Sequence, residues 1–224
     1  MSAVVPWQEL GRARVPGGEL VLSQRGEEFA IRLKGAELMN SRVHQSEELL
    51  ATLACKRLSE QVGVRVLIGG LGMGFTTRAA LGALAADARV EIAELLPEVV
   101  EWNRGPLAHL AHHPLDDPRV TVEVTDVARK IGEADSVYQA ILLDVDNGPD
   151  AFTAPSNAAL YGAPGLKRAR RALVDRGVLA VWSVDDDKAF TGRLTGVGFT
   201  VEQHKVAPRS GSGARHVLWI ARAP

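Results

Sequence analysis

The chain has 224 residues, of which 46% are hydrophobic and 24% are charged, and its formal net charge at pH 7 is −1. This composition is typical of a globular protein with an apolar core, and the near-zero charge argues against nucleic acid as a partner. A single cysteine, Cys55, excludes an internal disulfide. The N-terminus has no secretory signal pattern, and no apolar run is long enough for a membrane span, so we expect a cytoplasmic protein without membrane contact.

The first part of the chain predicts a small antiparallel meander. Three short alternating segments within residues 9–39, ELGRARV, ELVLSQR and EFAIRL, are separated by PGG and GEE, a pattern typical of strands joined by tight turns. A helix is predicted over residues 46–62, where apolar residues recur at helical spacing, with Ser46 as the expected N-cap. We expect residues 1–45 to form a small N-terminal β segment and residues 46–224 to form the main domain.

From Val64 onward, predicted strands alternate with segments long enough for crossover helices. The strands are VRVLIG, RVEIAE, RVTVEV, YQAILLD, GVLAVWS, FTVEQHKV and RHVLWIA. Several are apolar throughout, as in a parallel sheet that helices cover on both faces. The predicted fold class is therefore α/β, a Rossmann-like, doubly wound, mostly parallel sheet. The last two strands should form a C-terminal antiparallel hairpin, with residues 209–216 in its loop.

A cluster of glycines follows the first strand of this sheet: Gly69, Gly70, Gly72 and Gly74 in VRVLIGGLGMG. Ligands of such sheets bind beyond the carboxyl ends of the strands, and the first strand-to-helix turn is the usual place. The amides of this loop and of the next helix would face an electronegative group of the ligand. The spacing differs from the dinucleotide fingerprint G-x-G-x-x-G, so packing within the protein is the alternative explanation.

Two acids follow the next two predicted strands. Glu94 ends the second strand, where a carboxylate can accept the hydroxyl hydrogens of a ribose. Asp126 follows the third strand, where it could accept a hydrogen bond from an adenine amine or, alternatively, cap the next helix. The succession of loop, Glu94 and Asp126 at adjacent strand ends predicts a nucleotide site.

These residues, together with YQAILLDVDNGP, resemble the class I S-adenosylmethionine-dependent transferases, and more narrowly the spermidine synthase (polyamine aminopropyltransferase) family. The resemblance covers about residues 10–221 and includes the N-terminal β segment, the helix beginning SEELLATLA, and ALYGAPGLKRARRALVDRGVLAVWS, with Tyr161 at an aromatic position. It implies an enzyme whose donor is S-adenosylmethionine or decarboxylated S-adenosylmethionine. Gln45 and His44, in SRVHQSEE, stand where the family lines its donor pocket.

The sequence departs from the family at positions that bind the amine. Gly72 stands where the glycine loop of the family carries an aspartate, and the fourth-strand motif has Asp144 and Asp146 two residues apart instead of three. The fifth strand ends in Trp182 and Ser183 where glutamine is usual. A cationic diamine is costly to bury without paired carboxylates, so these departures favour methyl transfer to a small-molecule acceptor over aminopropyl transfer.

Asp144 is the predicted catalytic base and Asp146 a second catalytic carboxylate, although Asp144 could instead cap a turn with the following DNGP. A non-catalytic nucleotide-binding module is a further alternative. The run DDDK at residues 185–188 could line the site or begin a helix. No metal is expected, because the three histidines in HLAHHP have no positioned fourth ligand. A homodimer is left open.

Overall fold

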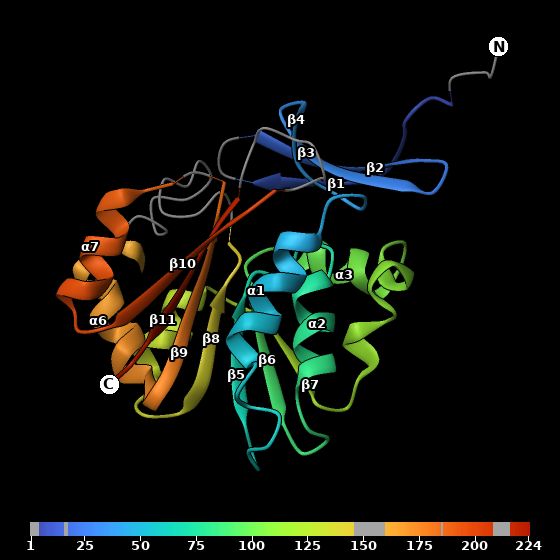
Figure 1. Cartoon of the computed structure of the whole chain (residues 1–224). Coiled ribbons are helices and arrows are strands. Elements are labelled where there is room, and N and C mark those ends of the chain that lie inside the picture. The colour runs from blue at the N-terminus through green and yellow to red at the C-terminus, as the bar shows by residue number, and fades with distance from the viewer. Residues whose placement is uncertain (1–4, 16–17, 146–159, 185, 208–215) are drawn as a thin grey trace.

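The computed structural model describes residues 5–15, 18–145, 160–184, 186–207 and 216–224. Its first part is a four-stranded antiparallel sheet, in the order β1-β2-β3-β4 (Figure 1). The turn between the last two strands places Lys34 and Gly35 at φ 50° and 83°, the conformation of a tight hairpin turn. The predicted meander is confirmed, and the structure adds its fourth strand. The bounds are β1 (Gln8–Val15), β2 (Gly18–Arg25), β3 (Glu28–Leu33) and β4 (Ala36–Asn40).

The second sheet has seven strands in the order β10-β11-β9-β8-β5-β6-β7. Neighbouring strands pair in parallel along β9, β8, β5, β6 and β7. Strands β10 and β11 form the predicted antiparallel hairpin at one edge. The bounds are β5 (Arg65–Gly69), β6 (Arg89–Glu94), β7 (Val120–Val124), β8 (Tyr138–Leu143), β9 (Leu173–Ser183), β10 (Thr200–Val206) and β11 (His216–Arg222).

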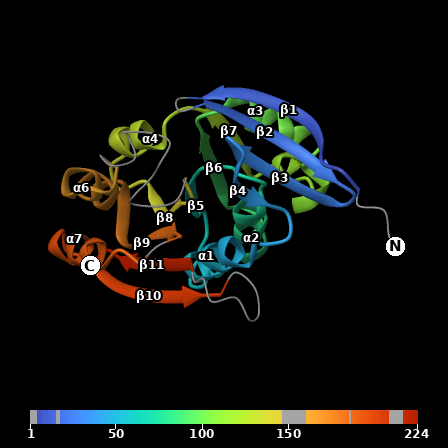
Figure 2. The same ribbon diagram turned by 90° about the horizontal axis from the view of Figure 1, so that it is seen from above.

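Helices cover both faces of the large sheet. Figure 2 shows α1, α2 and α3 on one side and α4, α6 and α7 on the other. Successive residues of each central strand point into opposite cores: in β5, Val66 and Ile68 join one cluster while Leu67 joins the other. This explains why the strands are apolar throughout. The helices are α1 (Gln45–Cys55), α2 (Phe75–Ala83), α3 (Pro97–Arg104), α4 (Val127–Glu133), α6 (Ala163–Ala172) and α7 (Lys188–Gly196), with short 3₁₀ helices η1 (Ala108–Ala111) and η2 (Pro114–Asp116).

Two details of the predicted elements are wrong. The first helix ends at Cys55 instead of residue 62, because the chain continues in turns that still bury Leu58. The apolar spacing therefore continues beyond the helix itself. Ser46 is not the N-cap: the helix begins one residue earlier, after His44, and the Ser46 side chain is completely buried.

The four-stranded sheet lies beside the carboxyl ends of the parallel strands (Figure 1). Gly11 of β1 packs closely against the Trp102 indole of α3, where an added Cβ would lie 2.5 Å from its nitrogen. At the same edge, the sulfur of Met39 in β4 would lie 3.6 Å from a Cβ added to Gly72 of the glycine loop. The small sheet is thus positioned next to the predicted ligand site. Among the described helices, none is long and apolar enough to cross a membrane.

Candidate functional site at the carboxyl ends of the strands

The glycine loop joins the end of β5 to the start of α2. Gly70, Gly72 and Gly74 all have positive φ, at 85°, 53° and 85°, which side chains of other residues rarely adopt. Gly70 also leaves no room, because an added Cβ would lie 2.4 Å from the backbone oxygen of Asp144. At Gly72 the nearest neighbour of such an atom would be the Met39 sulfur at 3.6 Å, an ordinary contact. Packing therefore explains Gly70, whereas Gly72 is partly exposed and is required by its positive φ alone.

The second half of the loop is held by a residue that the sequence analysis missed. Asn103 of α3 is buried, and its Nδ2 donates to the backbone oxygens of Gly72 at 2.8 Å and Val99 at 2.9 Å. Its Oδ1 lies 3.1 Å from the position of an added Cβ on Gly74. In the sequence, Asn103 belongs to EWNRG, which has no motif and reads as an exposed helix end. Its role becomes visible only when α3 packs against the loop.

Glu94 lies at the end of β6, next to the loop, and is 7% exposed. Its Oε2 accepts from the amide of Leu71 at 2.8 Å, and its Oε1 accepts from the amide of Leu96 at 2.9 Å. The carboxylate therefore joins the glycine loop to the turn that follows β6. A carboxylate has about four acceptor positions, so this structural role is compatible with the ribose contact expected from the sequence.

The structure places Asp126 and Gln45 at two helix starts. Asp126 is the N-cap of α4, with Oδ1 accepting from the amide of Ala128 at 2.8 Å, so the capping alternative is confirmed. Gln45 is exposed as the first residue of α1. His44, which precedes it, stacks on Phe75 at the start of α2 with ring centroids 4.0 Å apart. The starts of α1 and α2 therefore meet beside the glycine loop.

Asp144 follows the last residue of β8, beside the loop. Its amide donates to the Gly69 oxygen at 3.0 Å, and its Oδ2 accepts from the Thr76 hydroxyl at 2.6 Å. Burial raises the pKa of Asp144 to about 6, and the Thr76 hydrogen bond opposes that rise. Asp144 is thus suited to accept a proton near neutral pH. Asp146 lies outside the described residues.

Glu47, in the first turn of α1, is the second carboxylate of the site, and the sequence analysis missed it. Burial and then the negative charge of Asp144 raise the pKa of Glu47 to about 7. The two carboxyl groups come from distant parts of the chain and share a partly buried region at the carboxyl ends of the strands. Their proximity follows from the packing of α1 over the sheet and has no signal in local spacing. We call Glu47 and Asp144 the acidic pair.

Two further side chains, Trp182 and His216, converge with Glu47 on the buried hydroxyl of Ser46. The Trp182 indole nitrogen donates to Ser46 Oγ at 3.0 Å, and His216 Nδ1 lies 2.8 Å from the same oxygen. Ser46 Oγ donates to Glu47 Oε2 at 2.5 Å. Strands β9 and β11 supply Trp182 and His216, and α1 supplies Ser46 and Glu47.

Other acidic and basic candidates from the sequence have structural roles. In DDDK, Asp187 caps α7 by accepting from the amides of Ala189 and Phe190 at 2.8 and 3.0 Å, as the helix-start alternative predicted. Asp185 and most of the loop at 209–216 lie outside the described residues. Within the described part of the chain, no group of three or more histidine, cysteine, aspartate or glutamate side chains could hold a metal ion.

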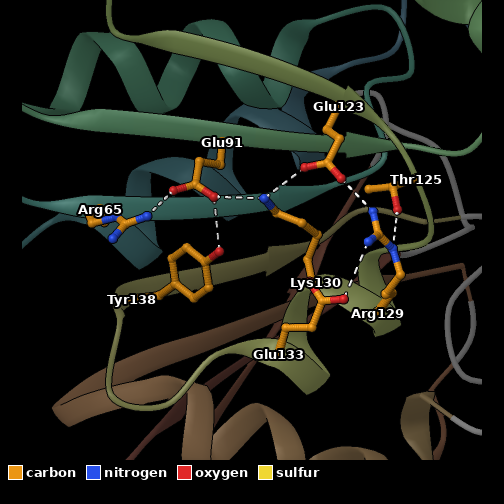
Figure 3. Close-up of polar contacts among 8 residues, drawn as sticks. All are labelled: Arg65, Glu91, Glu123, Thr125, Arg129, Lys130, Glu133 and Tyr138. Atoms are coloured by element: carbon orange, nitrogen blue, oxygen red, sulfur yellow. Dashed lines mark hydrogen bonds and ion pairs between the residues drawn. The ribbon is translucent and has the colours of Figure 1, made fainter.

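Figure 3 shows a polar network on the α4 side of the large sheet. Glu91 accepts from Arg65 at 2.5 Å and from the Tyr138 hydroxyl at 3.0 Å, and forms an ion pair with Lys130 at 3.1 Å. Lys130 also donates to Glu123 at 3.0 Å. The network links β5, β6, β7, β8 and α4. It holds the sheet to α4 and is built from other residues than the glycine loop and the acidic pair.

No protein-family model and no curated protein match the chain. Solved structures do match. The spermidine synthase from Thermotoga maritima is 18% identical, with a TM-score of 0.78. A spermidine synthase in complex with the transition-state analogue AdoDATO is 16% identical, with a TM-score of 0.76; each alignment covers 97% of this chain and 73% of the other. A probable spermidine synthase from Corynebacterium glutamicum is 16% identical, with a TM-score of 0.63, over 95% of this chain and 79% of the other. The chain therefore has a spermidine synthase-like fold.

Proposed function

We propose that this chain is an aminopropyltransferase that uses decarboxylated S-adenosylmethionine as donor and a small amine as acceptor. The observation that carries the proposal is the acidic pair. The sequence favoured methyl transfer because carboxylates that would bind an amine were missing from their usual positions. Glu47, which approaches Asp144 from α1, supplies a second carboxylate from another element.

The acidic pair suits a cationic acceptor for an electrostatic reason. Burial of a cation is costly unless an opposite charge compensates it. Two carboxyl groups that repel each other keep a proton at a higher pH than isolated ones, and an ammonium group between them would favour their ionised forms. A neutral or anionic methyl acceptor would gain nothing from this arrangement, so the acidic pair favours an amine.

The donor would occupy the edge formed by the glycine loop, Glu94 and Asp126. At the partly exposed Gly72, the absence of a side chain would let a ligand approach the backbone. Glu94 is proposed to bind the ribose hydroxyls and Asp126 the adenine amine, with Gln45 at the start of α1 as a further donor contact. Leu95, next to Glu94, is 53% exposed, an apolar surface that suits the face of a flat base. These contacts would orient the donor toward the end of β8.

When bound, the donor supplies a sulfonium that activates the carbon to be transferred. The protein's task is to position a nitrogen nucleophile in line with that carbon and to remove its proton. Asp144 would accept this proton on its carboxylate, assisted by its raised pKa, while the Thr76 hydroxyl holds the carboxylate in position. General base catalysis of this kind typically contributes about 10²- to 10⁴-fold to the rate.

A product assay with putrescine as the amine tests the proposal. The wild-type protein should transfer an aminopropyl group from decarboxylated S-adenosylmethionine, and Asp144→Asn should reduce turnover about 10²-fold or more while the fold is retained. Asp135→Asn is a matched control, because this exposed carboxylate lies before the other end of β8. Methyl transfer from S-adenosylmethionine, without aminopropyl transfer to any amine tested, would overturn the proposal. Donor binding with neither activity would instead support a non-catalytic module.

A further inference from the structure

The buried hydroxyl of Ser46 stands between a carboxyl group and an imidazole. Its Oγ lies 2.5 Å from Glu47 Oε2 and 2.8 Å from His216 Nδ1, and it accepts from the Trp182 indole at 3.0 Å. An indole nitrogen can only donate, and a serine hydroxyl has one hydrogen. The hydroxyl can therefore donate to Glu47 or to His216, but not to both at once.

From this geometry we infer that Ser46 and His216 form a proton relay that carries a proton from Glu47 to solvent. When Ser46 donates to ionised Glu47, His216 Nδ1 must carry a hydrogen and donate to Ser46. When Oε2 of Glu47 carries a proton, that proton can pass to Ser46 Oγ while the hydrogen of Ser46 passes to Nδ1 of His216. The imidazolium formed then releases its Nε2 proton, which restores a neutral ring.

The surroundings of His216 favour release of a proton from its ring over a lasting positive charge on it. Burial lowers the pKa of His216, so the imidazolium gives up its proton readily. The ring is only partly buried, and it makes a T-shaped contact with Trp182, with ring centroids 4.7 Å apart. On β10, the residue paired with His216 is Val206, which carries no charge. Among the described residues, the charged groups that raise the pKa of Glu47 are Asp144, just after β8, and Glu48 from its own helix.

The role of the relay rests on the proposed function: the relay would remove the proton that the reaction releases. An acceptor ammonium gives its proton to the acidic pair, and its nitrogen then bonds to the donor carbon as the carbon–sulfur bond breaks with its electron pair left on sulfur. The products are a secondary ammonium and a neutral thioether. One proton is released per turnover, and it must leave a partly buried region. Ser46 and His216 offer it a path from Glu47 to the partly exposed ring.

The test uses the ligand-free protein, so it does not depend on knowing the substrate. In ¹⁵N-histidine-labelled protein, the ring nitrogen shifts of His216, assigned with His216→Gln, report which nitrogen carries the hydrogen. We expect a change from the Nε2–H to the Nδ1–H form as the pH rises through about 7, the pKa of Glu47. Ser46→Ala and Glu47→Gln should each abolish this change, because the first removes the hydroxyl and the second removes the titrating group.

Two results would overturn the relay. One is a His216 ring that keeps the same neutral tautomer from pH 6 to pH 9 in the wild-type protein. The other is a tautomer change with the same midpoint in both folded variants. Failure of the aminopropyl assay with an intact tautomer change would refute the proposed function alone. The two proposals can therefore fail separately.

Discussion

Replacement of Glu47 by Gln should make the protein more stable at alkaline pH but not at acid pH. The pKa of Glu47 rises in the folded protein from 4.5 to about 7, chiefly through burial. Below pH 4.5, Glu47 is protonated in both the folded and unfolded chains. As the pH rises toward 7, the unfolded chain ionises first, so the free energy of unfolding falls. Each pKa unit corresponds to about 1.4 kcal/mol, so the fall reaches up to about 3 kcal/mol.

Glutamine cannot ionise and so avoids this loss, yet its amide can still bond to Ser46. Urea unfolding followed by tryptophan fluorescence at pH 5 and pH 8 measures the effect. The advantage of Glu47→Gln over the wild type should be small at pH 5 and rise to between about 1 and 3 kcal/mol at pH 8. Glu48→Gln is the control, since it removes a neighbouring carboxylate whose Oε1 lies 3.1 Å from His44 Nδ1. A Glu47→Gln advantage that is the same at both pH values would refute a buried, strained acidic pair.

Three substitutions test the glycine loop and its supports. Gly70→Ala should destabilise the protein by about 2 kcal/mol or more in thermal unfolding, because φ is 85° and the added Cβ meets the backbone oxygen of Asp144. Gly82→Ala is the control: this position of α2 is exposed and has open space, so the change should stabilise the protein by about 0.5–1 kcal/mol. Equal effects of the two substitutions would contradict the role of Gly70. Glu94→Gln leaves only one oxygen to accept from the two backbone amides of Leu71 and Leu96. The substitution should lower the free energy of unfolding by about 1–3 kcal/mol and weaken donor binding more than tenfold in calorimetry. Unchanged affinity would show that Glu94 is not part of the donor site. Asn103→Ala removes the side-chain donor to the Gly72 carbonyl and should lower the free energy of unfolding by about 1–3 kcal/mol. A variant as stable as the wild type would contradict this role of Asn103.

The sequence predicted the two sheets because their signals are local. Alternation in ELVLSQR and EFAIRL fits a sheet with one covered face, whereas the continuous apolar runs fit strands buried on both. The glycine loop was found in the same way, since four glycines after a strand rarely serve regular structure. The end of α1 was misplaced because Leu58 is buried from a turn and yet keeps the helical spacing.

The parts of the site that were missed depend on tertiary packing. Glu47 reads as an acid in the first turn of a helix, where acids are common, and only the position of α1 over β8 brings it to Asp144. Ser46 reads as a cap, yet Trp182 and His216 from two strands surround its hydroxyl. Asn103 has no motif at all. A local pattern predicts which residues end a strand, but not which distant side chains meet there.

The donor preference tests the central claim most directly. Calorimetric titration of the wild-type protein with decarboxylated S-adenosylmethionine, and separately with S-adenosylmethionine, compares two ligands that differ by one carboxylate. The acidic pair would repel that extra negative charge. We predict that the decarboxylated donor binds at least tenfold more tightly at pH 8, and that Glu47→Gln narrows the difference. Equal affinity for the two donors, or tighter binding of S-adenosylmethionine, would contradict aminopropyl transfer as the function of this site.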